Sequence, residues 1–489
     1  MSQLKSTGKV AGWGLIAFTV LWLTTVIRLD HSAIAESNIQ DSWQSLGVDA
    51  LSNNLFSSLG VLHTQPPGLN LIYAFDLAIT PNSHIALTIL YFLFAAISIY
   101  VVSDVLLRFG LPRKWAGAAA LLYALLPATV IYSLWPFTTT ACAFFGATAI
   151  WGISYLRTHQ LFGVVVTSIS AFALVMTRAS FTVPFLIAWL VVVALLVLRN
   201  AKQTRKAISL AIIGVFALSG IAIQFHYTSE FGIPTMSSWS GENLAKALTY
   251  SGARTVTPAA VERLKNDPCA LQMLDAWQNG KLRTWDVKQF DSLSECAKLS
   301  TPALKGVASW DDPVKVNSRQ DNFNYARRLV LSKQWSSIAI AVVRERPSQL
   351  FKMALSSGSG PRDSSLGVFL SPAEDYPGVT AIRDKNLVAQ PLGLLSLLFA
   401  PAMVFLLMVA IAMATFGKAY RLRRNPVFWF ATGLIGYQIL VSVLFEYGEN
   451  MRFQAEIAPL LVIVGFIGLW SPSSRQVSEL DPSDVMNKA

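Results

Sequence analysis

Two acidic residues, Asp30 and Glu36, stand six positions apart directly after the apolar stretch from Trp13 to Ile27, with Arg28 and His31 beside the first acid. An acid at the end of a membrane-spanning helix is by default a candidate functional residue, because charge is expensive at that depth. In a helical segment the two carboxylates lie less than about two turns apart and could reach one site. We therefore expect Asp30 to serve as a base or substrate organiser, assisted by Glu36. An ordinary solvated acid paired with Arg28 is the alternative.

A second segment, "LHTQPPGLN", contains His63, Gln65 and the proline pair Pro66 and Pro67. The prolines stiffen the chain and disfavour helix at Gln65. The segment is predicted to enter an interfacial helix rigidly and to hold His63 and Gln65 at a fixed place, where they would contact substrate.

A third segment, "FEYGENMRFQAEIAPLL", contains Glu446, Glu449, Arg452 and Glu456. Charge this dense between two membrane helices is costly unless it lines a wet cavity. The alternative is a solvated turn with internal ion pairs, which are weak. We expect Glu449 and Arg452 to contact substrate.

Membrane-spanning helices must position these residues. The 489-residue chain is 53% hydrophobic and 14% charged, a composition typical of polytopic membrane proteins. Apolar runs of about 20 residues, the length that crosses a bilayer, lie near residues 11–27, 84–104, 115–135, 138–156, 161–177, 181–198, 207–225, 391–416, 426–445 and 457–471. No small-residue cleavage pattern follows the first run, which therefore reads as a retained span. The predicted fold is all-α, with roughly ten transmembrane helices.

Basic residues concentrate in alternate loops, namely LRFGLPRK, LRTH, RNAKQTRK and GKAYRLRRN. Such loops stay on the cytoplasmic side, so both termini are predicted to be cytoplasmic in a bacterial inner membrane, with the site extracytoplasmic. The net charge of +11 thus reports topology, and no nucleic-acid partner is expected. Three arginines are exceptions to this distribution of basic residues, because they lie at helix ends predicted to be on the outer side: Arg28, Arg178 and Arg452. Each could snorkel or pair locally, but together they suit a lipid-linked phosphate or pyrophosphate.

The chain divides into a membrane module over 1–225 with its first outer loop at 28–83, an extracytoplasmic, mainly helical region over 226–390, the last transmembrane helices over 391–471 and a cytoplasmic tail over 472–489. Cys269 and Cys296 fall in the extracytoplasmic region, where a disulfide is plausible chemistry. Two unpaired buried thiols are the alternative. The three cysteines show no zinc-binding spacing.

The order of these motifs resembles the GT-C superfamily of membrane glycosyltransferases, especially the branch of protein O-mannosyltransferases and the lipid A aminoarabinose transferase. The resemblance rests on the acid after the first span, the D-x5-E spacing of Asp30 and Glu36, and Gln65-Pro66-Pro67 about thirty residues later. It extends to "YALLPATVIYSLWPFTTTACAFFGATAIWGISYLR", to "LVMTRASF" and to the arginine-containing loop before the last span. It covers most of the membrane region but not the long outer region.

The resemblance implies transfer of a sugar from a polyprenyl-phosphate donor to a glycan, lipid or protein acceptor on the outer side of the membrane. The acid of the active centre would be Asp30. The donor phosphate would be held best by Arg452 and less closely by Arg28 or Arg178. Displacing phosphate from an anomeric carbon independently requires a base for the incoming hydroxyl and cations for the leaving phosphate.

This chain departs from the family pattern in three places. His31 stands where a second acid is common, Phe137 and Thr138–Thr140 stand where another acid is common, and Gln65 replaces a basic residue. We therefore assign no metal ligand and no certain cofactor, leaving a divalent metal and the donor sugar open. Two other functions are considered, a transporter or flippase of a lipid-linked saccharide and an inactive GT-C-like scaffold in envelope assembly. Transporters often show inverted repeats and broken helices, neither of which the sequence reveals.

Overall fold

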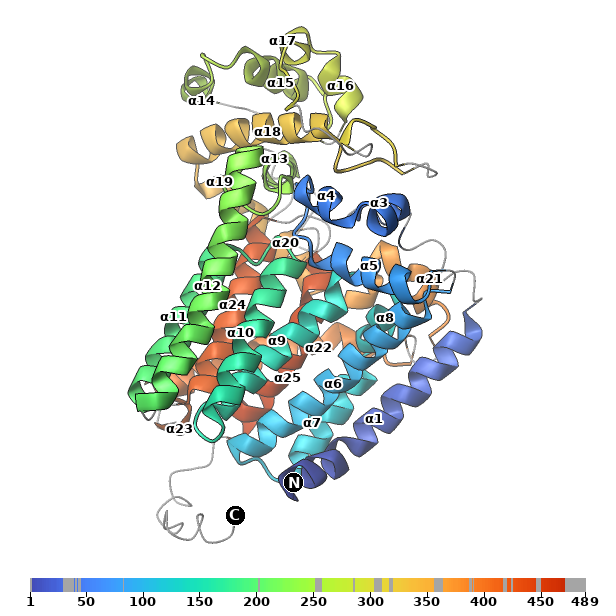
Figure 1. The fold of residues 1–489 in the computed structure, drawn as a ribbon, viewed down its shortest axis with the longest axis vertical. Helices are drawn as coiled ribbons and strands as arrows, with labels where there is room; N and C mark the ends of the chain where they lie inside the picture. The colour runs from blue at the N-terminus through green and yellow to red at the C-terminus, as the bar shows by residue number, and fades with distance from the viewer. Residues whose placement is uncertain are drawn as a thin grey trace.

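The computed structural model describes residues 2–29, 39, 42, 45–81, 83–200, 203–250, 257–284, 286–302, 310–315, 320–355, 364–386, 389, 391–416, 420–423, 425–445 and 450–470. Helices form the regular secondary structure of these residues, apart from one isolated β-bridge between Val314 and Asp321. Long helices pack side by side and shorter ones cover one end of the bundle (Figure 1). The predicted all-α class is confirmed.

Seven helices in the described residues are long and apolar enough to cross a membrane. They are α1 (Ser2–Arg28), α6 (Ile85–Phe109), α10 (Gln160–Thr177), α12 (Gln203–Phe231), α22 (Gly393–Phe416), α24 (Pro426–Phe445) and α25 (Asn450–Leu469). An eighth span results if α7 (Arg113–Leu125) and α8 (Pro127–Leu134), which meet at an angle of 53°, are taken together. The chain is therefore a multi-pass membrane protein.

The count of roughly ten spans is not confirmed, for reasons that lie in individual helices. α9 (Thr138–Tyr155) begins with three threonines, which lower its hydropathy, although it lies inside the bundle against α6, α10 and α25. α11 (Val183–Asn200) is a shorter apolar helix. The span expected at 115–135 is bent because Leu126 is extended before Pro127, and proline disfavours helix at the preceding residue.

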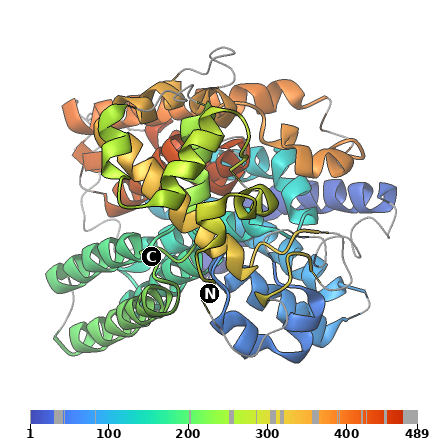
Figure 2. The same cartoon turned by 90° about the horizontal axis from the view of Figure 1, so that it is seen from above.

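Burial within the bundle is uneven. α25 is the most deeply buried of the candidate spans, whereas α1 exposes Trp13, Ile16, Val20 and Leu23. α11 and α12 pack together at one side of the bundle (Figure 2). Exposed apolar side chains along such helices are compatible with lipid, which is as apolar as they are.

Short helices form a cap over one end of the bundle. The cap consists of α13 (Trp239–Tyr250), α14 (Pro258–Arg263), α15 (Pro268–Gln278), α16 (Val287–Asp291), α17 (Ser294–Ala297), α18 (Ala326–Glu345), α19 (Ser348–Leu355), α20 (Ser365–Phe369), the 3-10 turns η3 (Ala373–Asp375) and η4 (Pro377–Val379), and α21 (Thr380–Arg383). α18 lies across the bundle (Figure 1). α3 (Val48–Asn53), α4 (Leu55–Gly60) and α5 (Gly68–Ile79) lie at the same end.

The outer part of the cap has its own hydrophobic cluster, which includes Met273, Trp277 and Trp335. Cys269 on α15 and Cys296 on α17 belong to this cluster and form a disulfide, with their sulfur atoms 2.06 Å apart. The sequence allowed either a disulfide or two unpaired thiols here, and the structure has the disulfide.

The N-terminus lies at the opposite end of the bundle from the cap (Figure 1). The ends of α6, α9 and α11 and the starts of α7, α10, α12 and α24 are also there. The basic loops of the sequence connect these helix ends. The basic loops and the cap thus lie at opposite ends of the molecule.

Candidate functional site

A cavity of about 750 Å³ opens between the cap and the bundle, and we call it the cap cavity. Three residues predicted from sequence, Gln65, Arg178 and Arg452, line it together. The other polar lining residues include Ser180, Thr182, Thr235, Ser237, Ser238, Ser240, Asn243, Lys246, Ser332, Lys333, Ser336 and Tyr437. None of the described residues that line it is acidic, so the cavity is suited to an anion.

Arg178 follows the last residue of α10 and is 5% exposed. Its guanidinium group donates a hydrogen bond of 3.0 Å to Thr138 Oγ1, lies 3.9 Å above the ring of Phe453, and forms an ion pair with Glu456. The second carboxylate oxygen of Glu456 accepts a hydrogen bond of 2.7 Å from Gln438. Arg178 therefore joins α9, α10 and α25 at the floor of the cavity, with its charge largely offset by Glu456.

Arg452 lies in the first turn of α25 and is 2% exposed. Its guanidinium carbon is 4.9 Å from the ring centre of Phe137 and 5.7 Å from that of Tyr376, distances at which an aromatic ring attracts a cation. Phe137 contacts Arg452 through its ring, and Thr138 contacts Arg178 through its hydroxyl group, so neither contact adds a negative charge.

The proline pair holds Gln65 at the cavity wall. Pro67 precedes α5, and Gly68 lies so close to α10 that a Cβ atom there would be 2.5 Å from the carbonyl oxygen of Met176. Only glycine allows this approach. The carbonyl of Gln65 accepts a hydrogen bond of 3.0 Å from the hydroxyl of Tyr227 on α12. The rigid placement expected of the segment thus rests on contacts with two spanning helices.

His63 is fully buried and is not among the residues that line the cap cavity. Its Nδ1 atom lies 2.7 Å from Ser238 Oγ, its backbone N–H donates to Asn324 Oδ1 at 2.8 Å, and its ring meets that of Trp310 edge to face. Burial lowers the pKa of His63 to about 3. The side chain is therefore neutral near pH 7 and links the segment before α5 to the cap, behind the cavity wall.

We expect His63 to make the protein less stable in mild acid. Its pKa of about 3 in the folded protein is below the usual value of 6.5, so the stabilisation is present above pH 6.5 and is lost as the pH falls. Between pH 7 and pH 5 the loss should be about 2 kcal/mol. Thermal unfolding in detergent should show wild type losing more stability over this interval than His63→Asn, which keeps a polar atom near the Nδ1 position. Equal losses would contradict the assignment.

Arg28 lies at the end of α1, is exposed, and donates a hydrogen bond of 3.1 Å to the carbonyl of Lys385. It lines a different cavity of about 670 Å³, together with Glu374, Asp375 and Asp384. The structure does not bring Arg28 into the cap cavity.

The predicted catalytic pair, Asp30 and Glu36, lies outside the described residues, as do His31, Glu446 and Glu449. Their roles stay predictions from sequence. Among the residues that the structure does describe, no group of three or more His, Cys, Asp or Glu side chains could hold a metal ion.

Sequence reasoning missed Lys333, a half-buried residue of α18. Its ammonium group lies beside Gly232, which ends α12 with a φ of +61°; a Cβ atom there would be 3.1 Å from the lysine nitrogen. Burial lowers the pKa of Lys333, and no described carboxylate pairs with it. Lysines are common in the polar outer region, so nothing in the sequence singled this one out.

The cavity has a polar and an apolar side. Arg452 and Lys333 supply positive charge, whereas Ile340 and Phe445 are lining residues with exposed apolar side chains. Guanidinium and ammonium groups bind phosphate oxygens through charge-assisted hydrogen bonds. The arrangement is suited to a molecule that joins a phosphate group to an apolar chain.

No protein-family model and no curated protein sequence matches the chain. Among solved structures, the crystal structure of ArnT from Cupriavidus metallidurans in the apo state is similar, with 12% sequence identity and a TM-score of 0.32. The match covers 94% of this chain and 78% of the ArnT chain. By its long apolar helices, the chain is a multi-pass membrane protein.

Proposed function

We propose that the protein is a GT-C type glycosyltransferase that moves a sugar from a polyprenyl-phosphate donor to a glycan, lipid or protein acceptor. The observation that carries the proposal is the cap cavity, in which Gln65, Arg178 and Arg452 meet although they are far apart in the sequence. The GT-C-like order of the sequence motifs supports the same reading. The cap would cover the site and shape the binding of the acceptor.

In the proposed reaction, the hydroxyl oxygen of the acceptor attacks the anomeric carbon of the donor sugar. The bond between that carbon and the phosphate oxygen breaks, and the phosphate keeps the electron pair. Arg452 and Lys333 would stabilise the charge that develops on the phosphate. Asp30 would take the proton of the attacking hydroxyl, assisted by Glu36. Glu449 would help to position the substrate.

The proposed orientation puts the cap outside the cytoplasmic membrane and both termini in the cytoplasm. The segregation of the basic loops to the end opposite the cap supports it, because such residues are retained on the cytoplasmic side. The disulfide between Cys269 and Cys296 fits the oxidising compartment that this orientation gives the cap.

The direct test is to incubate the purified protein with a panel of radiolabelled polyprenyl-phosphate sugars and envelope extracts as acceptors. We expect transfer from at least one donor. Turnover would exclude both a flippase and an inactive scaffold. Binding of donors without any turnover by a folded protein would contradict the proposal.

Lys333→Gln should lower kcat/KM for the donor about tenfold to a hundredfold, since a charge-assisted hydrogen bond contributes about 1.5–3 kcal/mol. Lys298→Gln is the matched control, because Lys298 is an exposed lysine of the cap paired with Glu295 and is not a lining residue. An unchanged kcat/KM in Lys333→Gln, or equal changes in both variants, would remove Lys333 from the donor site.

A further inference from the structure

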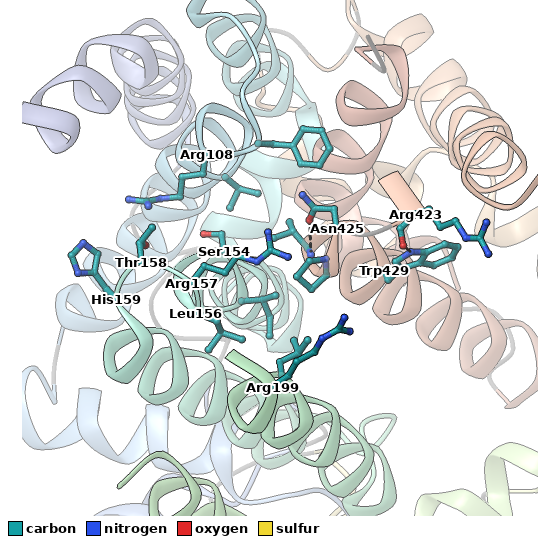
Figure 3. Close-up of a pocket in the computed structure, with 16 residues that line it drawn as sticks. Arg108, Ser154, Leu156, Arg157, Thr158, His159, Arg199, Arg423, Asn425 and Trp429 are labelled. Carbon is teal, nitrogen blue, oxygen red and sulfur yellow. Dashed lines mark hydrogen bonds between the residues drawn. The ribbon is translucent and has the colours of Figure 1, made fainter. Parts of the chain in front are cut away.

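A second cavity, of about 830 Å³, lies at the end of the bundle opposite the cap (Figure 3). It is formed where α6, α9, α11 and α24 end or begin. Four arginines and a histidine line it, and none of its described lining residues is acidic. The basic lining residues are Arg108, Arg157, His159, Arg199 and Arg423. We call it the basic-end cavity.

The four arginines are not equivalent. Arg108 pairs with Asp104 at 2.6 Å and stacks 3.5 Å from the ring centre of Tyr155, and it points away from the cavity centre (Figure 3). Arg157 and Arg199 extend into the space, and Arg423 lies at its edge (Figure 3). These three are exposed, and no described carboxylate lies within ion-pair distance of any of them.

Unpaired cations around one space repel each other, and a bound anion relieves that repulsion. The positive-inside bias explains why arginines occur at this end, but it does not require that they share one cavity without acids. Their planar donor groups match phosphate oxygens in bidentate geometry.

The start of α24 lies in the same wall. It begins at Pro426, and Asn425, Pro426 and Val427 all line the cavity. Asn425 Oδ1 accepts a hydrogen bond of 2.9 Å from the N–H of Val427, and the indole N–H of Trp429 donates to the carbonyl of Arg423 at 3.0 Å. The first turn of a helix is electropositive and favours anions, so this geometry adds to the field of the arginines.

We propose that the basic-end cavity binds a phosphate group, at a site separate from the cap cavity and independent of the glycosyltransferase assignment. Arg157 and Arg199 would hold the phosphate oxygens, with the start of α24 behind them. The phosphate would belong either to an anionic lipid headgroup of the adjacent leaflet or to a soluble ligand.

The test compares two double variants that remove the same charge from the same end of the bundle. Arg157→Gln with Arg199→Gln alters the cavity. Arg113→Gln with Arg205→Gln alters exposed arginines that do not line it. Native mass spectrometry measures phosphatidate binding against phosphatidylcholine, and equilibrium dialysis measures radiolabelled inorganic phosphate. Thermal unfolding should be unchanged in both double variants because all four side chains are exposed. If a double variant does not fold, the same binding comparison is made with the single variants.

We expect the cavity variant, but not its control, to lose binding about tenfold or more. Loss confined to phosphatidate identifies a lipid headgroup, and loss confined to inorganic phosphate identifies a soluble ligand. Equal loss in both double variants would overturn the proposal in favour of general surface charge. Failure of the wild-type protein to bind either probe would also overturn it.

Discussion

Asp30→Asn is expected to lower the rate of sugar transfer by about 10²–10⁴-fold, the usual contribution of general acid–base catalysis. Asparagine keeps the size of the side chain but cannot take the proton of the acceptor hydroxyl. The effect should appear in kcat with the preferred donor. Membrane insertion and thermal unfolding should remain those of the wild type, because the change removes chemistry and leaves the spanning helices intact.

Asp49→Asn is the matched control for this prediction. Asp49 is an exposed acid of α3, nineteen residues after Asp30 in the sequence, and it accepts a hydrogen bond of 2.7 Å from Asn53 on the next turn. The Asp49→Asn variant should transfer sugar at nearly the wild-type rate. Near-normal transfer by Asp30→Asn, or an equal loss in the control, would end the assignment of Asp30 as the base.

Removing one partner of the Arg178–Glu456 pair should destabilise the protein by about 3–5 kcal/mol. Both side chains are buried where α10 meets α25, so either one left alone would be a buried charge without its counterion. Arg178→Met and Glu456→Met are suitable variants because methionine fills space flexibly without charge. Denaturant or thermal unfolding in detergent would measure the loss.

The double variant distinguishes a specific ion pair from two unrelated losses. With both side chains replaced by methionine, neither member of the pair leaves a buried charge behind, so stability should recover to well above either single variant. Arg263–Glu345, a partly exposed pair in the cap, is the control and should contribute at most about 1 kcal/mol. Strictly additive losses at Arg178 and Glu456 would contradict the ion-pair account.

The sequence predicted the class of the fold because membrane spans depend on a one-dimensional property, the length of an apolar run. It predicted the number and shape of the spans less well where single residues interrupt a helix or lower the hydropathy of a run. Leu126 is extended because of Pro127, which bends one expected span, and the threonines at 138–140 make α9 less apolar than its place in the bundle requires. The cap had no such signal, since its short helices are arranged by contacts between distant residues.

The same distinction applies to the site. Arg178 and Arg452 were identifiable because arginines are rare at their positions under the predicted topology, and both line the cap cavity. Lys333 stood in a polar region where one more lysine carries no information. His63 was identifiable as a polar residue near a rigid turn. Its burial behind Ser238 and Trp310 depends on a part of the chain that the turn does not predict.

The attachment of the His63–Gln65 segment has a consequence for biosynthesis. Its partners Tyr227, Ser238 and Asn324 follow 162, 175 and 261 residues later in the chain. Several spanning helices will therefore have been synthesised before the His63–Gln65 segment can reach its final shape. A nascent chain that ends before the cap holds the first helices of the bundle but cannot yet form the cavity wall, so the site is completed late in synthesis.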